Sequence, residues 1–146
     1  MNKVLARKPP GSFWAISILL LIWNVMGVFA YLSQVNTSDE QLAQTYPAAE
    51  IAILSSAPGW VTGAFALAVF AGLSGVIALL ARKSWSRWLF VISLIAVLVQ
   101  HFWTFFLSGL LDIVGLERVI MPFVVVILCI FQVWYAGYGT GRGWLR

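Results

Sequence analysis

The sequence contains few of the side chains that hold metals, form disulfides or carry charge. Among its 146 residues are one cysteine and one histidine, and only 10% are charged. A single cysteine excludes an intramolecular disulfide and a thiolate metal cluster. One histidine and one cysteine also fall short of the three or four protein ligands that a metal site needs, so neither a metal nor another cofactor is expected.

The low charge also excludes an ordinary soluble domain, in which about a quarter of the residues are charged. Here 62% of the residues are hydrophobic, more than a soluble fold of this size can hide from water. The net charge of +4 is confined to segments that flank the apolar stretches, so nucleic acid is not an expected partner. The lipid bilayer is the expected surrounding of this chain.

Four apolar stretches are long enough to cross a bilayer, since a helix that rises ~1.5 Å per residue needs about 20 such residues. None of them has Asp, Glu, Lys or Arg in its central part. The sequence therefore predicts an all-α membrane protein, residues 1–146, folded as a single bundle of four transmembrane helices. The predicted spans are residues 13–32, 60–81, 88–109 and 119–138.

The charges of the connecting segments predict how the four spans are oriented. Only Arg118 among the nine basic residues falls on the same side as the five acidic residues. Because cytoplasmic loops are enriched in Lys and Arg, both termini are expected in the cytoplasm, and the protein is expected in the bacterial inner membrane. The basic residues of the cytoplasmic side are Lys3, Arg7, Lys8, Arg82, Lys83, Arg87, Arg142 and Arg146.

The first span has an alternative interpretation as a cleavable signal peptide, because basic residues precede an apolar run that passes through Val28-Phe29-Ala30. That run is about 20 residues long, whereas the apolar part of a signal peptide has about 7–15. It also contains Asn24, which is unusual in a signal core. A retained transmembrane helix is therefore favoured.

Two further segments have distinct local patterns. Residues 33–59 form the outer loop and are expected to contain two short helices. Thr37 with Glu40 and Ser38 with Gln41 match a capping box, and Pro47 suits the first turn of the second helix. A packed cap is favoured here over a lid.

The tail, residues 135–146, has closely spaced glycines but no preceding strand, so a flexible basic segment at the membrane surface is expected rather than a phosphate loop.

Uncharged polar side chains inside the spans are the candidate functional residues. An amide or imidazole without a partner costs several kcal/mol in hydrocarbon, so these groups are expected to face the interior of the bundle. Counted from the cytoplasmic ends, Asn24, Gln100 and His101 lie roughly 15–20 Å deep and are expected to meet. Thr104 continues the stripe of Gln100, and Gln132 is expected nearer the cytoplasmic face. The second span offers a ridge of small residues, namely Ala64, Ala68, Gly72 and Gly75.

This polar seam has two interpretations. In the structural one, its side chains form hydrogen bonds between helices, each contributing about 0.5–2 kcal/mol, and fix the helix register. In the functional one, they line a site for a small neutral solute, or His101 senses or relays protons. No catalytic site is expected, because every carboxylate lies outside the spans and a Ser-His-acid set cannot be assembled.

Two segments resemble a group of small four-span bacterial inner-membrane proteins. They are WNVMGVFAYLSQ, residues 23–34, and APGWVTGAFALAVFAGLSGVIALLARK, residues 57–83. Members of this group are usually hypothetical proteins and are sometimes labelled "sugar transporter". The resemblance implies a four-span fold and a substrate class, but no binding residues.

The function expected from the sequence is that of a non-enzymatic accessory, assembly or small-molecule-binding membrane protein. Its expected partners are the bilayer and either another membrane protein or a second copy of the chain. The alternative is a transporter of a small neutral solute such as a sugar, with its site near Asn24, Gln100 and His101.

Overall fold

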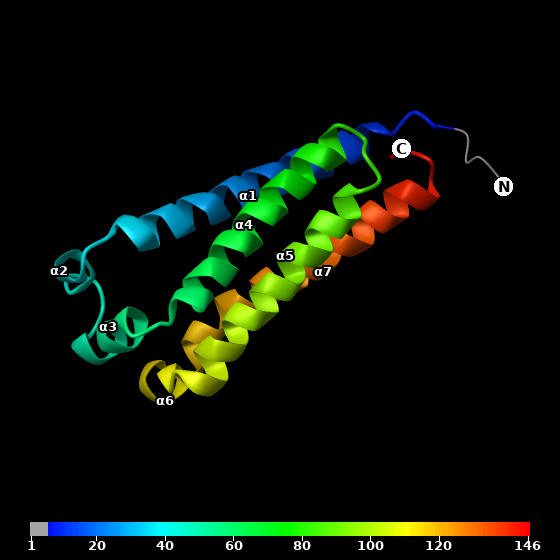
Figure 1. The fold of residues 1–146 in the computed structure, drawn as a ribbon. Helices are drawn as coiled ribbons and strands as arrows, with labels where there is room; N and C mark the ends of the chain where they lie inside the picture. The colour runs from blue at the N-terminus through cyan, green and yellow to red at the C-terminus, as the bar shows by residue number, and fades with distance from the viewer. Residues whose placement is uncertain (1–5) are drawn as a thin grey trace.

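The computed structural model describes residues 6–146 as a helical chain with four helices long and apolar enough to cross a membrane (Figure 1). The predicted fold class, an all-α chain with four potential spans, is therefore confirmed. These helices are α1 (Gly11–Asn36), α4 (Gly59–Leu80), α5 (Ser86–Phe102), which continues into a π-helical turn (Trp103–Leu107), and α7 (Ile120–Gly141).

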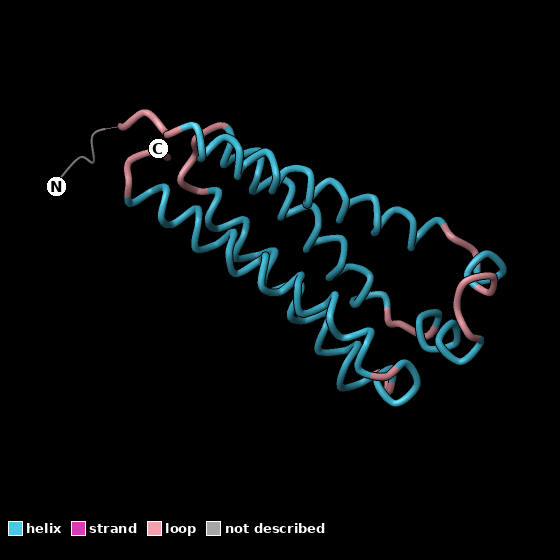
Figure 2. The backbone as a smooth tube through the Cα atoms, turned by 180° about the vertical axis from the view of Figure 1, so that it is seen from behind, coloured by secondary structure: helices cyan, strands magenta, loops and turns pink. Residues whose placement is uncertain are grey.

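The four long helices pack in chain order, α1 on α4, α4 on α5 and α5 on α7. α1 and α7, the first and last of this row, meet through side chains near the termini, where the Phe13 ring stacks on Tyr135 with their centroids 6.2 Å apart. Toward the opposite end α1 diverges from α5 and α7, as both views of the backbone show (Figures 1 and 2). The bundle is thus closed at one end and splayed at the other.

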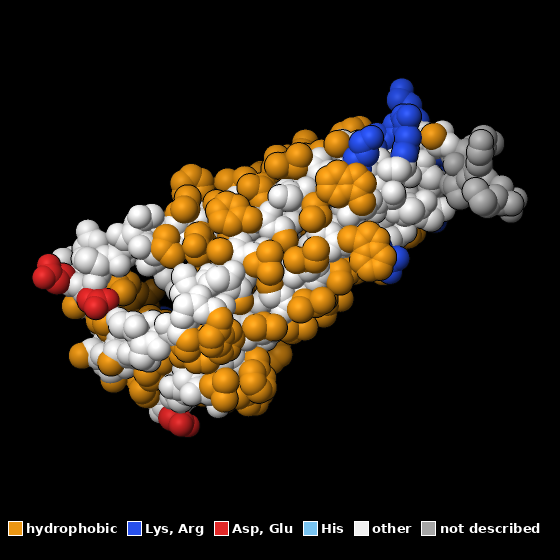
Figure 3. All heavy atoms as spheres, viewed as in Figure 1, with side chains coloured by type: hydrophobic (Ala, Val, Ile, Leu, Met, Phe, Trp, Pro, Cys, Tyr) orange, Lys and Arg blue, Asp and Glu red, His pale blue; other side chains and the backbone are white. Residues whose placement is uncertain are grey.

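Charge is segregated between the two ends of the bundle. Apart from Arg118, the described Lys and Arg side chains gather at the end where α1 begins and α7 ends, and Asp and Glu lie at the opposite end, with apolar side chains between them (Figure 3). We call these the basic end and the acidic end. Lys3, one of the predicted flanking cations, lies outside the described residues.

The interior of the basic half is filled by a hydrophobic core. Gly75 of α4 makes room for the Phe90 ring of α5, because a Cβ on Gly75 would lie 2.7 Å from the nearest ring carbon. This part of the small-residue ridge therefore accepts an aromatic ring from the neighbouring helix. The core consists of Phe13, Leu20, Val76, Leu79, Phe90, Tyr135, Ala136 and Leu145.

The C-terminal tail belongs to this core, so the prediction of a flexible surface segment is wrong. Gly143 adopts a left-handed conformation (φ 75°) after α7, and the Trp144 N–H donates to the Gly139 carbonyl at 2.9 Å. This Schellman turn reverses the chain. Leu145 then packs into the core and is only 5% exposed. Burial of an apolar side chain stabilises the folded tail, and the glycine spacing alone does not indicate this burial.

α4 ends in the same type of turn, but its left-handed residue is Arg82 (φ 59°) rather than glycine. The Lys83 N–H donates to the Ala78 carbonyl at 2.8 Å, as the Schellman motif requires. The Arg82 guanidinium donates from Nε to the Trp144 carbonyl and from Nη2 to the Arg7 carbonyl, each at 2.8 Å. These two charge-assisted bonds tie three chain segments together and offset the strain of the left-handed backbone.

At the acidic end, two short helices, α2 (Asp39–Leu42) and α3 (Ala48–Ser55), connect α1 to α4. Ser38 and Gln41 form the capping box predicted for this pair. Thr37 does not cap, because its hydroxyl donates to the Ser33 carbonyl at the end of α1. Pro47 precedes the first residue of α3 instead of lying inside its first turn.

The connection between α5 and α7 contains α6 (Leu110–Val114) and a 3-10 turn, η2 (Leu116–Val119). It packs against α3 through the only ion pair among the described residues, in which Arg118 lies 3.4 Å from the carboxylate of Glu50. Glu50 is buried, and the Arg118 guanidinium also lies over the Tyr46 ring, 5.3 Å from its centroid. The two connections of the acidic end are thereby joined.

Candidate functional site

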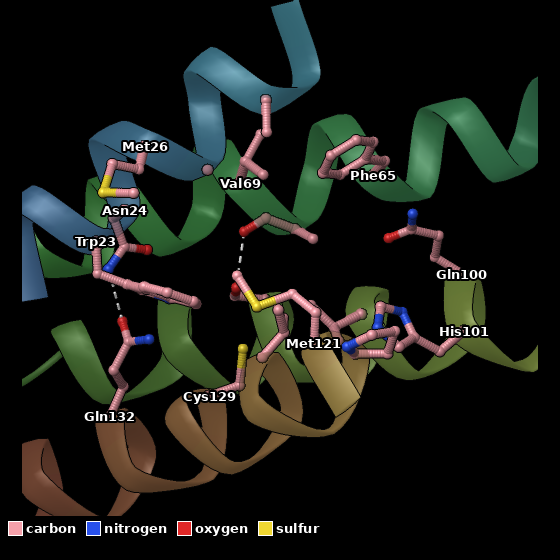
Figure 4. Close-up of a pocket in the computed structure, with 17 residues that line it drawn as sticks. Trp23, Asn24, Met26, Phe65, Val69, Gln100, His101, Met121, Cys129 and Gln132 are labelled. Atoms are coloured by element: carbon pink, nitrogen blue, oxygen red, sulfur yellow. Dashed lines mark hydrogen bonds between the residues drawn. The ribbon is translucent and has the colours of Figure 1, made fainter. Parts of the chain in front are cut away.

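A cavity of about 350 Å³ lies between the four long helices, on the side of the core that faces the acidic end (Figure 4). Each of α1, α4, α5 and α7 contributes to its lining. The cavity is within the size range of small-molecule sites, which measure roughly 300–1,000 Å³. It forms where the divergence of α1 leaves space that the core residues do not fill.

The floor of the cavity is a hydrogen bond between α1 and α7. Asn24 Nδ2 donates to Gln132 Oε1 at 2.9 Å and to the Leu20 carbonyl at 2.8 Å (Figure 4). Both amides are buried, with 7% of Asn24 and 2% of Gln132 exposed. That Gln132 lies nearer the cytoplasmic face than Asn24 stays a prediction, but the two side chains are close enough to bond, which the sequence did not indicate. α7 extends to Gly141, three residues beyond the predicted end, and this adds ~4.5 Å to the depth of Gln132.

The small residues of α4 let these polar groups approach closely. A Cβ on Gly72 would collide with Asn24 Oδ1 and would lie 3.2 Å from Ser93 Oγ. The Ser93 hydroxyl donates to the Ala68 carbonyl at 2.7 Å and holds α5 against α4. α4 therefore contributes backbone and space to the floor rather than polar side chains.

Gln100 and His101 line the same cavity from α5, but they lie apart from the Asn24–Gln132 pair (Figure 4). The expected meeting of Asn24 with these two residues is not formed. Both ring nitrogens of His101 are buried without a hydrogen-bond partner among the described residues. The Val97 carbonyl lies near the ring, one turn earlier on α5, without forming a bond of acceptable geometry. A buried polar group in this state costs about 1–3 kcal/mol.

Thr104 is the one predicted seam residue that does not line the cavity. Its hydroxyl donates to the Gln100 carbonyl at 3.1 Å, within its own helix. The other four predicted residues, Asn24, Gln100, His101 and Gln132, surround one space, although only Asn24 and Gln132 are bonded to each other.

Most of the remaining lining is apolar and is not among the residues predicted from the sequence. Trp23, Phe65 and Val69 line the cavity, and no pattern separates such side chains from ordinary packing residues (Figure 4). Met26 of α1 and Met121 of α7 also line it, and each is 58% exposed. Both methionines therefore reach the surface of the bundle as well as the cavity.

The chemistry of the lining fits an uncharged ligand. None of the described lining residues is Asp, Glu, Lys or Arg. No group of three or more metal-ligating side chains occurs in the described part of the chain. What the cavity offers is amide, imidazole and hydroxyl groups at its floor and along α5, surrounded by aromatic and thioether surface.

Together, the fold and the cavity define a multi-pass helical protein with four candidate membrane spans around a cavity with a polar floor. Comparisons with protein-family models, with curated proteins and with solved structures found no match. The cavity is therefore the feature from which a function is inferred.

Proposed function

We infer that this chain is a non-enzymatic protein of the bacterial inner membrane that binds a neutral, largely apolar small molecule in the cavity between its four spans. The basic end faces the cytoplasm in this proposal, because Lys and Arg are retained on that side during insertion. The segregation of charge between the two ends supports this orientation.

The observation that carries the proposal is the half-buried imidazole of His101 at the wall of an uncharged cavity, with both ring nitrogens buried and without a hydrogen-bond partner among the described residues. A ligand with a hydroxyl or carbonyl group would supply the missing hydrogen bond and recover the cost of burying the imidazole. The apolar part of such a ligand would lie against Trp23, Phe65 and Met121. A charged ligand would find no counter-charge in the lining.

Two lining methionines indicate how the ligand enters. Met26 of α1 and Met121 of α7 line the cavity and are also exposed on a surface that lipid would cover, so we place the entrance in the gap between these two helices. A neutral amphiphile dissolved in the bilayer reaches this gap without crossing water. Methionine suits such a gap, because its flexible thioether adapts to ligands of different shape.

Transport of a small neutral solute such as a sugar is a second candidate function. It is supported by the Asn24–Gln132 bond, which separates the cavity from the packed basic half of the bundle. A solute that exchanged hydrogen bonds with these two amides could pass this level. The resemblance to four-span proteins labelled "sugar transporter" points in the same direction.

Thermal unfolding in a mild detergent separates the two candidates. Purified protein is titrated with neutral amphiphiles, such as fatty alcohols and monoacylglycerols, and in parallel with neutral sugars. A ligand at 100 times its Kd stabilises the folded state by about 2.7 kcal/mol, which raises the melting temperature of a chain of this size by roughly 5–10 °C. We expect this shift with amphiphiles and not with sugars.

Two variants locate the binding site. His101→Leu removes the imidazole and should abolish most of the amphiphile shift, whereas Thr104→Val, on the same helix but outside the lining, should retain it. An amphiphile shift of equal size in both variants would refute binding at His101. Stabilisation by sugars alone, lost in Asn24→Leu, would replace the proposal with the transporter, which sugar uptake into proteoliposomes would then test.

A further inference from the structure

We propose that a second hollow, at the basic end, binds the headgroup of an anionic phospholipid. It lies between the first turn of α5 and the last turns of α7, far from the cavity described above along both helices. Its volume is about 340 Å³, and its lining consists of Ser84, Trp85, Arg87, Trp88, Gly137 and Thr140.

Arg87 is positioned across this hollow by its contact with α7. A Cβ on Gly137 would lie 3.4 Å from both Cζ and Nε of Arg87, so the guanidinium rests on the α7 backbone at a point where no side chain intervenes. Its planar fork matches the oxygens of a phosphate better than a lysine ammonium does.

Within residues 6–146, no carboxylate lies within ion-pair distance of the Arg87 guanidinium. The only ion pair among the described residues joins Glu50 and Arg118 at the acidic end, and all five acidic residues belong to that end. The first turn of α5 also lacks an acidic residue, so the positive end of its helix dipole is not compensated by a side chain. The hollow therefore holds a guanidinium with no acidic side chain beside it among the described residues, and the Arg146 carboxylate at its edge already accepts a bond from the Ser84 N–H at 2.7 Å.

The flanking tryptophans place this charge at the level of lipid headgroups. Trp85 is 53% exposed and Trp88 is 69% exposed, and tryptophan prefers the interface between hydrocarbon and water. A phospholipid whose phosphate contacts Arg87 and Ser84 would lay its acyl chains along the apolar surfaces of α5 and α7. Thr140 already donates its hydroxyl hydrogen to the Ala136 carbonyl, so Ser84 is the hydroxyl donor for the phosphate. Basic hollows between transmembrane helices on the cytoplasmic side are typical sites for anionic headgroups.

The experiment measures lipid binding to delipidated, detergent-solubilised protein by native mass spectrometry, with thermal shift as a second readout. Phosphatidylglycerol is compared with phosphatidylcholine of the same acyl chains, and inorganic phosphate is titrated separately. We expect phosphatidylglycerol to bind more tightly, and Arg87→Gln to weaken it by roughly five- to tenfold relative to phosphatidylcholine. Lys83→Gln removes a neighbouring cation that does not line the hollow, and should change this ratio less than twofold.

Each variant serves as its own reference, because the ratio of the two lipids is measured in the same protein, and a general loss of stability does not change that ratio. Arg87→Lys keeps the charge but loses the planar guanidinium, so its ratio of phosphatidylglycerol to phosphatidylcholine binding should fall between those of the wild type and Arg87→Gln. Equal effects of Arg87→Gln and Lys83→Gln would show diffuse surface attraction and overturn the site. Equal binding of phosphatidylglycerol and phosphatidylcholine would also overturn the site. If inorganic phosphate raised the melting temperature as much as phosphatidylglycerol does, the hollow would be assigned to a soluble anion instead of a lipid. His101→Leu leaves the ratio unchanged if the two sites are independent.

Discussion

Replacing Gly72 by alanine tests whether the approach of α1 to α4 holds the floor of the cavity together. The added Cβ would collide with Asn24 Oδ1 and would lie 3.2 Å from Ser93 Oγ. Both of these oxygens belong to buried residues. The Asn24 amide must therefore move, and it cannot move far without losing its 2.9 Å bond to Gln132.

The expected loss of stability combines three contributions. Overpacking by a methyl group costs typically about 1–3 kcal/mol, and an interhelical hydrogen bond in a membrane protein contributes about 0.6 kcal/mol on average and about 1.7 at most. The higher helix propensity of alanine returns up to ~1 kcal/mol. We therefore expect the Gly72→Ala variant to lose roughly 1–4 kcal/mol of unfolding free energy.

The assay is reversible unfolding in mixed micelles, in which denaturing detergent is added to protein in mild detergent and helix content is followed by circular dichroism. Gly63→Ala is the matched control, because Gly63 is in the same helix and a Cβ at this position would meet no neighbouring group within 4 Å. Alanine at position 63 should leave the stability unchanged or raise it by up to ~1 kcal/mol. The two variants make the same chemical change and differ in what the methyl group meets.

A double-mutant cycle with Asn24→Ala identifies the contact responsible. If the methyl group acts through Asn24, the Gly72→Ala change should cost much less in the Asn24→Ala background than in the wild type. If the losses of unfolding free energy in Gly72→Ala and Asn24→Ala add in the double variant, the new methyl group does not act through Asn24. Equal stabilities of Gly72→Ala and Gly63→Ala would refute the close packing at the floor altogether.

Three further predictions concern the bonds that join separate parts of the chain. Asn24→Leu and Gln132→Leu should each lower the unfolding free energy by about 1–2 kcal/mol, and the double variant should lose less than their sum, measured by the same detergent titration. Arg82→Gly relieves the left-handed strain but removes two charge-assisted bonds, so we expect a net loss of about 1 kcal/mol and faster removal of the tail by carboxypeptidase. Arg118→Gln should destabilise more than the double variant with Glu50→Gln in thermal unfolding, because the single change leaves a buried carboxylate unpaired.

The four long helices can be predicted from the sequence because length and apolarity alone decide which segments can cross a bilayer. Their ends are predicted less accurately, since polar residues can continue a helix beyond the hydrocarbon. α1 ends at Asn36, four residues past the predicted end of the span, and the Asn36 side chain donates to the Leu32 carbonyl. The position of the tail cannot be predicted from the sequence either, because the burial of Leu145 depends on a fold that brings α1, α4 and α7 together.

The polar residues of the site can be identified individually from the sequence, but their pairing cannot. Asn24, Gln100, His101 and Gln132 are conspicuous in apolar helices, and all four line the cavity. Which of them touch depends on helix tilt and on the true end of α7, and a count of residues along straight helices contains neither. The apolar lining around Trp23 and Phe65 carries no signal in the sequence, because a side chain that faces an empty space resembles one that faces a neighbour.

The seam between α1 and α7 is made of side chains alone, with no backbone hydrogen bond between these two helices among the described residues. At the basic end a main-chain bond from the Arg7 N–H to the Gly143 carbonyl, 2.8 Å long, ties the start of α1 to the turn after α7, so the distance between α1 and α7 can change mainly toward the acidic end. In a bilayer we therefore expect the separation of α1 and α7 at the acidic end to depend on the thickness and curvature of the surrounding membrane.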